Sequence, residues 1–320
     1  MSRFIIQRLV QTIFVLILVS LIVFIVMRFL PGDPILLYLS EDQVRNFTPQ
    51  QIAEVRHQFG LDKPMMVQYV DWIYGISHGD FGISMSYRIP VWEEISRRVP
   101  ITFYLGSIAF LASIIIGIPM GLIAAVKRGK WSDTVATLFA NLGITVPIFW
   151  LGILMIYLFG LYLKWLPTFG YTSPFEDFWL SMKQAIMPVI CLSVFAIASS
   201  ARQTRSAMLE VIQQDYIRTA WAKGLKERVV ILRHALKNSL IPVVTLKGIS
   251  LRNIFGGSVL VESVFNVPGM GRLAVNAMLA RDYAVVQGVI LIIAVVVCLA
   301  NLIVDISYGW LDPRIRYGKS

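Results

Sequence analysis

The chain has 320 residues, of which 57% are hydrophobic, and its mean hydropathy is +0.69. A soluble domain of this length could not bury so much apolar surface, so the composition excludes an ordinary soluble globular protein and predicts a protein solvated by lipid. The formal net charge of +10 is then first a signal of membrane topology, and only second a hint of anionic partners.

The first predicted element is an uncleaved transmembrane helix within residues 1–30. Arg3 and Arg8 precede an apolar run over residues 9–27, which is long enough to span roughly 30 Å of hydrocarbon. A signal peptide has a shorter apolar core and a cleavage site of small residues. Here the run ends at Arg28 and is followed by LPGDP, so we expect the helix to be retained.

Residues 31–100 are predicted to form an extracytoplasmic loop region with short helices. Thr48 is a good N-cap, Gln51 stands at the capping-box position and Gly60 is a stop signal. A second short helix is predicted within residues 63–80. This region is either a small external platform for a partner or a packed loop that covers the helix ends.

Five further apolar spans follow and form, with the loops between them, a predicted five-helix core over residues 101–310. We expect the third span of the chain to be tilted or broken near Pro147, and the fourth is short and weakened by Pro188. The tail, 311–320, is expected to be cytoplasmic. The five spans are 102–126, 134–162, 185–201, 240–264 and 285–306.

The charges of the loops predict the orientation of the chain in the membrane. Loops and termini on the N-terminal side of the six spans hold 16 basic and five acidic residues, whereas the opposite loops hold 10 basic and 13 acidic residues. Because basic residues favour the cytoplasmic side, both termini are predicted to be cytoplasmic. The segment 202–239 is then cytoplasmic too.

This cytoplasmic segment contains a short predicted helix. Asp215 is a good N-cap and Gly224 a good residue for the position after the helix. Between them, Thr219 and Ala220 are small residues surrounded by positive charge. The helix could lie on anionic lipid, but a lipid-facing helix would carry large apolar residues, so we favour insertion into a cleft of another protein.

The fifth span carries polar residues at depths where their transfer into the hydrocarbon core costs free energy. Counted from Ile241, Lys247 lies about 9 Å and Arg252 about 16 Å into the span, with Asn253 beside it. They could line a pathway for a substrate with a carboxylate. Alternatively they pair with a carbonyl group or a helix end, and Lys247 could also extend to the interface.

Two other classes of protein fit less well. An ion-coupled secondary transporter would use carboxylates or other ion ligands near the membrane midplane, and the predicted spans offer none there. An intramembrane enzyme would need a catalytic set such as Ser and His, and none of the predicted spans contains a histidine. The scattered histidines and the two cysteines in apolar runs predict no metal site and no disulfide framework.

The segment around the short helix resembles the EAA loop of ABC-transporter permeases, in the form found in the dipeptide, oligopeptide and nickel permease family. The EAA element corresponds to residues 218–220, and Gly224 to the glycine four residues after it. Arg218 replaces the usual glutamate, a departure that this subfamily shares. The resemblance runs nearly end to end through LPGDP at 30–34, GLD at 60–62, GDFG at 79–82, WLP at 165–167, PGMGR at 268–272, RDY at 281–283 and DPRIR at 312–316.

The resemblance implies an all-α polytopic membrane protein with six transmembrane helices and the type I ABC importer permease fold. It implies a non-catalytic subunit that forms half of a translocation pathway in an ATP-driven importer. The chain lacks the glycine-rich phosphate loop, so it is expected to hold no cofactor, and ATP and Mg²⁺ would be bound by partner ATPase subunits. Residues expected to couple the permease to the ATPase are Asp215, Tyr216, Arg218, Thr219, Ala220, Lys223 and Gly224.

The partners implied are a second homologous permease, two ATPase subunits, an extracytoplasmic substrate-binding protein and membrane lipids, with no nucleic acid. The expected location is the inner or plasma membrane. Di- or oligopeptides are the favoured substrates, and nickel chelates and oligosaccharides remain alternatives, because specificity would lie largely in the binding protein.

Overall fold

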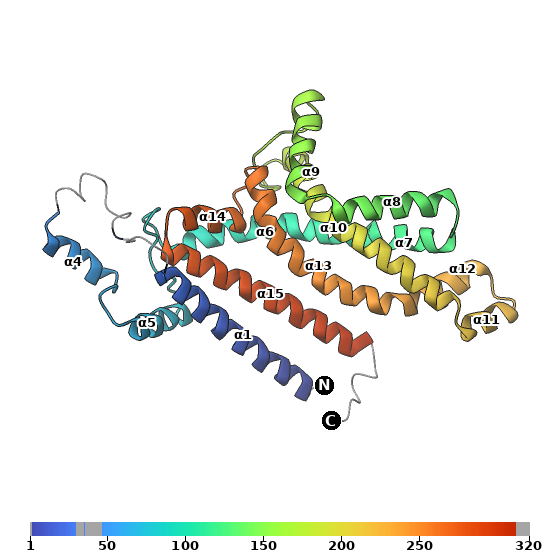
Figure 1. Ribbon diagram of the computed structural model, residues 1–320, viewed down its shortest axis with the longest axis horizontal. Coiled ribbons are helices and arrows are strands. Elements are labelled where there is room, and N and C mark those ends of the chain that lie inside the picture. Colours follow the sequence, from blue (N-terminus) through green and yellow to red (C-terminus); the bar gives the residue numbers. More distant parts are fainter. Residues whose placement is uncertain (1, 30–34, 36–46, 312–320) are drawn as a thin grey trace. The chain divides into compact units, whose positions relative to one another are not determined.

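The computed structural model describes residues 2–29, 35 and 47–311 (Figure 1). The LPGDP motif at 30–34 and the tail from residue 312 onward lie outside the described residues. In the described ranges the secondary structure is helical, apart from one isolated antiparallel bridge between Ile83 and Pro90. Contacts between residues divide the chain into two compact units.

The described residues of the first unit are 102–267 with the segments 2–6 and 299–311 near the chain ends. Its long helices follow from its apolar runs, because a backbone in lipid must satisfy its own hydrogen bonds. In chain order its elements are the later part of α6 (Val91–Ile115), α7 (Gly117–Val126), α8 (Trp131–Thr145), α9 (Ile148–Met155), the π-helix η1 (Ile156–Tyr162), α10 (Phe178–Ile212), α11 (Asp215–Ala222), α12 (Glu227–Val229), the π-helix η2 (Val230–Ala235) and α13 (Leu236–Val264).

Helix α10 is the centre of this unit and packs against α7, α8, α9 and α13. Two neighbours approach it closely at glycines. A Cβ atom added to Gly117 would lie 2.7 Å from Ser200 Cβ, and one added to Gly143 would lie 2.9 Å from Ala198 Cβ. Side chains do not tolerate such distances, so glycine permits the contact, as small residues do at helix interfaces in membranes.

A sharp bend of 105° separates α8 from α9. Val146 ends α8 in an extended conformation and Pro147 is the N-cap of α9. Proline lacks an N–H group and pushes the preceding residue out of the helical region. The predicted break near Pro147 is therefore confirmed. Pro188, by contrast, lies inside the 35-residue helix α10, which extends beyond the predicted span 185–201 at both ends.

Four helical segments in the described part are long and apolar enough to cross a membrane, and the bent pair of α8 with α9 and η1 is a fifth if it is one span. These segments contain five of the six predicted spans or most of their length. The remaining predicted span, the fifth at 240–264, lies in α13, a helix of 29 residues that is less apolar. The number of six spans therefore stays a prediction. The four segments are 6–29, 91–126, 178–212 and 283–303.

The second unit comprises residues 7–101 and 268–298. A cluster of buried side chains, which includes Met27, Phe81, Ile95, Leu273 and Val286, forms its core. Helix α14 lies between the predicted spans 240–264 and 285–306, where no helix was predicted. The elements are most of α1 (Ser2–Phe29), α4 (Pro49–Gln58), α5 (Met65–Ser77), the first part of α6, α14 (Met270–Leu279) and the first part of α15 (Tyr283–Leu311).

Helix α4 begins as its sequence predicts. The Thr48 hydroxyl accepts from Gln51 N, and Gln51 Oε1 accepts from Thr48 N at 2.8 Å, which completes the capping box. Gly60 follows the helix with a φ of +63°. Beyond it, the hydrogen bond between the His57 ring and the carboxylate of Asp62 lowers the pKa of Asp62. The second predicted short helix is α5.

Asp282, in the RDY motif, organises the start of α15. Its side chain is fully buried and its Oδ2 accepts hydrogen bonds from Ser84 Oγ at 2.5 Å and Ser86 N at 3.0 Å. Its Oδ1 accepts from Val285 N at 3.3 Å in the first turn of the helix. A buried carboxylate needs such donors, so the motif holds the loop at residues 84–86 to the helix start.

Candidate functional site

The short cytoplasmic helix predicted from the sequence is α11, of eight residues. Its N-cap is Gln214, which makes no side-chain capping bond, and Asp215 is the first helical residue. The prediction that Asp215 caps the helix is therefore wrong by one position. Asp215 instead places a negative charge in the first turn, where it complements the positive end of the helix dipole.

The end of α11 is set by Gly224, as predicted. Gly224 has a φ of +75°, which glycine adopts without steric cost. Its N–H donates to Trp221 O at 2.9 Å, and the next N–H, of Leu225, donates to Ala220 O at 3.4 Å. This pair of bonds is a Schellman motif, which satisfies the last carbonyl groups and turns the chain sharply.

One face of α11 packs inward. Ile217 is fully buried and Ala220 is 7% exposed. They join a cluster with Met208 of α10, Val230 and Ala235 of η2, and Ala125 of α7. The expectation that Ala220 is displayed for docking is therefore wrong. A small residue is required there because the helix lies against its own chain.

The other face of α11 is exposed and carries most of the predicted coupling residues. Tyr216 and Trp221 are 44% and 40% exposed. The Tyr216 hydroxyl accepts from Asn238 Nδ2 at 2.8 Å, which orients the ring. Arg218 forms a loose ion pair with Asp215 at 3.7 Å, and Thr219 Oγ1 donates to Asp215 O at 3.0 Å. The remaining exposed residues of this face include Lys223 and Gly224.

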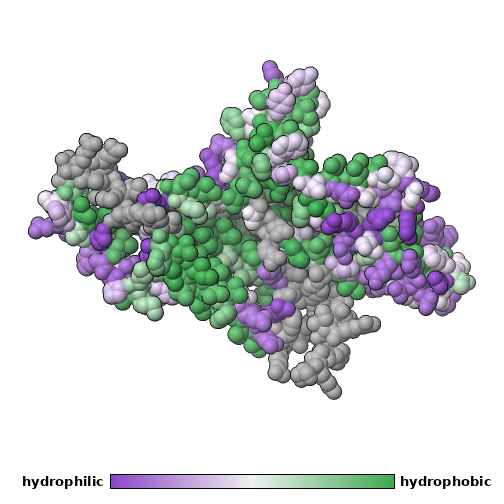
Figure 2. Space-filling model, viewed as in Figure 1, coloured by the Kyte–Doolittle hydropathy of each residue, from purple (hydrophilic) through white to green (hydrophobic). Residues whose placement is uncertain are grey.

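The surface at this end of the first unit is hydrophilic. Figure 2 shows hydrophilic residues gathered where α11 and α12 lie, and hydrophobic residues along the long helices. Arg218, Lys223, Lys226 and Arg228 are exposed there. α11 thus presents two aromatic rings within a basic surface and is held from behind by Ile217. This arrangement suits a partner with an apolar cleft and an acidic rim.

Lys247 is enclosed within the first unit. Its side chain is 7% exposed, and its Nζ donates to the Ser113 carbonyl oxygen at 3.0 Å, to Ser113 Oγ at 2.8 Å and to Ser200 Oγ. An ammonium group has three hydrogens, and these partners use all of them. The geometry corresponds to the structural alternative for Lys247, which ties α13 to α6 and α10, and not to a free cation in a pathway.

Arg252 and Asn253 lie on α13, but their side chains are outside the described part of the structure. Their predicted role in the pathway stays a prediction. In the part of the chain that the structure describes, no group of three or more His, Cys, Asp and Glu residues could hold a metal ion.

The carboxylates of Glu262 and Asp133 are buried, which the sequence did not predict. Glu262 stands near the end of the predicted span 240–264; it lies in α13, is 1% exposed and accepts from Thr102 Oγ1 at 2.7 Å. Asp133, at the start of α8, accepts two hydrogen bonds from Arg205 of α10, at 2.6 and 2.9 Å, and one from Gly129 N. A bidentate pair such as Asp133–Arg205 fixes the relative orientation of the two helices as well as adding stability. The two residues are 72 positions apart, so the sequence alone does not show that they pair.

Comparisons with known proteins identify the family. Residues 117–317 match the family described as binding-protein-dependent transport system inner membrane component, and residues 1–106 match the N-terminal family of the same components. The dipeptide transport system permease protein DppB of Escherichia coli (strain K12) is 40% identical, over the whole of both chains. A protein of Brucella abortus (strain 2308) named as a peptide transport system permease is 42% identical, over 99% of this chain and all of its own.

A solved structure agrees on the fold. The inward-facing MetNI methionine ABC transporter matches with a TM-score of 0.56 and 20% identity, over 68% of this chain and 96% of that one. At this identity the likeness shows the fold alone, which is that of a type I ABC importer permease. Two family models and full-length relatives agree with it. The chain therefore belongs to the inner-membrane permease family of binding-protein-dependent ABC transport systems.

Proposed function

We propose that this chain is the permease subunit of an ATP-driven importer of di- or oligopeptides. The observation that carries the proposal is that two relatives named as peptide permeases are 40–42% identical over nearly all of both chains. The permease has no catalytic role of its own. It forms half of the translocation pathway, and a second homologous permease forms the other half.

Two ATPase subunits drive the transporter, and α11 couples this chain to one of them. The exposed face of α11, with Tyr216, Arg218, Thr219, Trp221 and Lys223, docks in a cleft of the ATPase. Because Ile217 and Ala220 anchor the helix in the cluster beneath it, movement of the ATPase is transmitted to α10 and α13. ATP and Mg²⁺ are bound by the ATPase subunits.

In the pathway, Arg252 and Asn253 of α13 meet the substrate carboxylate. Lys247 supports the same helix from behind through Ser113 and Ser200 and does not contact the substrate. An extracytoplasmic binding protein delivers the peptide. The permease lies in the inner membrane with both termini in the cytoplasm, which the excess of basic residues in its N-terminal-side loops supports.

The substrate class can be tested by reconstitution. The complex, with its ATPase subunits and binding protein, is placed in proteoliposomes with ATP, and uptake of a labelled dipeptide is measured. We expect uptake that requires both ATP and the binding protein, and no uptake of a nickel chelate or an oligosaccharide. ATP-dependent uptake of either alternative without dipeptide uptake would reject the peptide assignment.

The orientation predicts opposite labelling of two exposed positions. Gln50 lies on α4, and Lys226 follows Gly224 after α11. The two native cysteines, both buried, are first replaced by serine to give a cysteine-free chain. A cysteine at position 50 is expected to react with an impermeant thiol reagent in intact cells, and one at position 226 only after permeabilisation. The reverse pattern would invert the proposed topology.

A further inference from the structure

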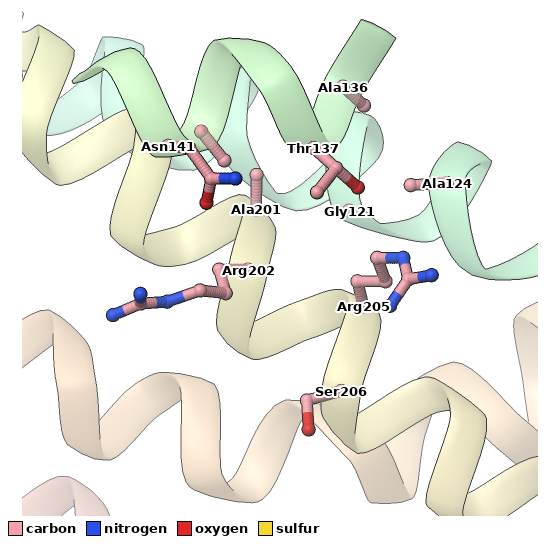
Figure 3. Close-up of a pocket in the computed structure, with 10 residues that line it drawn as sticks. Gly121, Ala124, Ala136, Thr137, Asn141, Ala201, Arg202, Arg205 and Ser206 are labelled. Carbon is pink, nitrogen blue, oxygen red and sulfur yellow. The ribbon is translucent and has the colours of Figure 1, made fainter. Parts of the chain in front are cut away.

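A pocket of about 270 Å³ lies between α7, α8 and α10 in the first unit (Figure 3). Its floor consists of small residues from all three helices, which leave room because they carry one methyl group or none. Polar side chains stand around this floor. The lining residues are Gly121, Ala124, Ala136, Thr137, Ala140, Asn141, Ala201, Arg202, Arg205 and Ser206.

The two arginines of the pocket differ in their partners. Arg205 is committed to Asp133 through two hydrogen bonds. Arg202, one turn away on α10, is exposed, and within the described residues it makes no ion pair or hydrogen bond. Figure 3 shows the two side chains extending in opposite directions from α10. Arg202 therefore supplies an uncompensated positive charge with five donors.

Two neutral polar side chains complete the polar edge. Asn141 of α8 and Ser206 of α10 are exposed, and neither side chain has a hydrogen-bond partner in the described part of the chain. Asn141 lies on the same side of the pocket as Arg202 (Figure 3). Arg202 and Asn141 can both donate to the oxygens of one anion, and no carboxylate is among the residues that line the pocket.

The position of the pocket indicates where such an anion would come from. The Asp133–Arg205 pair is joined to Gly129 in the turn at 127–130, which links two apolar helices and must lie at a membrane face. This turn carries Lys127, Arg128 and Lys130. Arg202 lies only about 4.5 Å of helix rise beyond Arg205. The free cation is therefore near the level of lipid headgroups.

An apolar stripe on α8 continues from the pocket. Val135, Leu138, Phe139 and Leu142 are each about half exposed and follow the three- and four-residue spacing of one helix face. This face adjoins the one that lines the pocket through Ala136, Thr137 and Ala140. A headgroup in the pocket would thus leave its acyl chains against a surface already suited to them.

We propose that this pocket binds the phosphate group of an anionic phospholipid from the same leaflet as the turn at 127–130. The Arg202 fork and the Asn141 amide hold the phosphate, and the α8 stripe holds the acyl chains. Basic pockets between transmembrane helices bind acidic headgroups by this chemistry, and arginine suits phosphate because its donors lie in one plane. A peptide carboxylate or free phosphate could accept the same hydrogen bonds, but it has no acyl chains to cover the apolar stripe on α8.

The test uses the full-length chain purified with its partner subunits. Native mass spectrometry counts retained phosphatidylglycerol against phosphatidylcholine with identical acyl chains. We expect Arg202→Gln to lower phosphatidylglycerol retention at least fivefold. Arg128→Gln removes the same charge from the exposed turn outside the pocket and is expected to change retention less than twofold. Ala136→Leu, which fills the pocket but keeps both arginines, is expected to match Arg202→Gln.

The outcomes separate the sources of the anion. An equal, small loss in Arg202→Gln and Arg128→Gln would show general attraction to a basic surface and overturn the proposal. Displacement of the lipid by millimolar dialanine or by inorganic phosphate would assign the pocket to a soluble anion instead and would also overturn it. If Arg202→Gln cannot be purified, Ala136→Leu alone tests the proposal, because phosphatidylglycerol retained in that variant would contradict binding in the pocket.

Discussion

Replacing Thr219 with arginine is expected to abolish peptide uptake while the permease still accumulates in the membrane. Thr219 lies on the exposed face of α11, so an arginine there has room in the isolated chain. In the proposed cleft of the ATPase the same side chain would clash and would add a charge to a desolvated contact. We expect co-purification of the ATPase subunits to fall at least tenfold, with unchanged abundance of the permease in membranes.

Ala220→Arg is expected to fail in a different way. Ala220 is 7% exposed and packs with Ile217 against Met208, Val230 and Ala235. A long charged side chain cannot enter this cluster, so α11 would detach and the chain itself would be destabilised. We therefore expect reduced abundance and a lower unfolding temperature as well as loss of uptake. Fluorescence-detected size-exclusion chromatography measures both properties.

An exposed position on α4 provides the control. Gln50→Arg adds the same charge to an exposed helix of the second unit and is expected to change neither uptake nor co-purification with the ATPase. If Thr219→Arg transported peptide at the native rate with a full complement of ATPase, the exposed face of α11 would not be the coupling surface. If Ala220→Arg accumulated normally, the packing of α11 on its own chain would be wrong.

The second large effect is expected at Gly121, where α7 meets α10. A Cβ atom there would lie 2.7 Å from Thr204 Cβ and would also collide with the backbone carbonyl of Ala201. Backbone cannot move aside as a flexible side chain can, so Gly121→Val must separate the two helices. Overpacking of this kind costs about 1–3 kcal/mol or more, and the contact lies at the centre of the first unit. We expect the variant to accumulate several-fold less and to unfold at a clearly lower temperature.

Gly256 offers the matched substitution. It also lies in a long helix, but a Cβ atom added there meets no atom of the described residues within 4 Å. Gly256→Val is therefore expected to leave abundance and unfolding temperature nearly unchanged. Thermal unfolding of the two variants in the same detergent compares them directly. Equal behaviour of the variants would show that the close approach of α7 to α10 does not limit stability.

Local signals in the sequence were sufficient for many element boundaries. The Thr48–Gln51 capping box begins α4, Pro147 separates α8 from α9, and Gly224 ends α11. Each signal acts through the backbone of residues at most a few positions away, so it can be recognised without knowledge of the fold. The composition likewise determined that the chain belongs in lipid, and the ordered motifs indicated its family, which the full-length relatives confirm.

The tertiary structure alone decided which way the side chains of the candidate site face. Ala220 turns inward because α10 and η2 come together behind α11, and Lys247 is satisfied by Ser113 and Ser200, which lie 134 and 47 residues away. Arg205 pairs with Asp133 across 72 residues, while Arg202 on the next turn stays free of such a bond within the described chain. Periodicity predicts that a helix has two faces, but burial and hydrogen-bond partners depend on which distant segments pack against each face. For that reason the positions of α11 and α13 could be predicted from the sequence. Which of their side chains are buried as anchors, and which stay exposed to a partner, was decided only by tertiary packing.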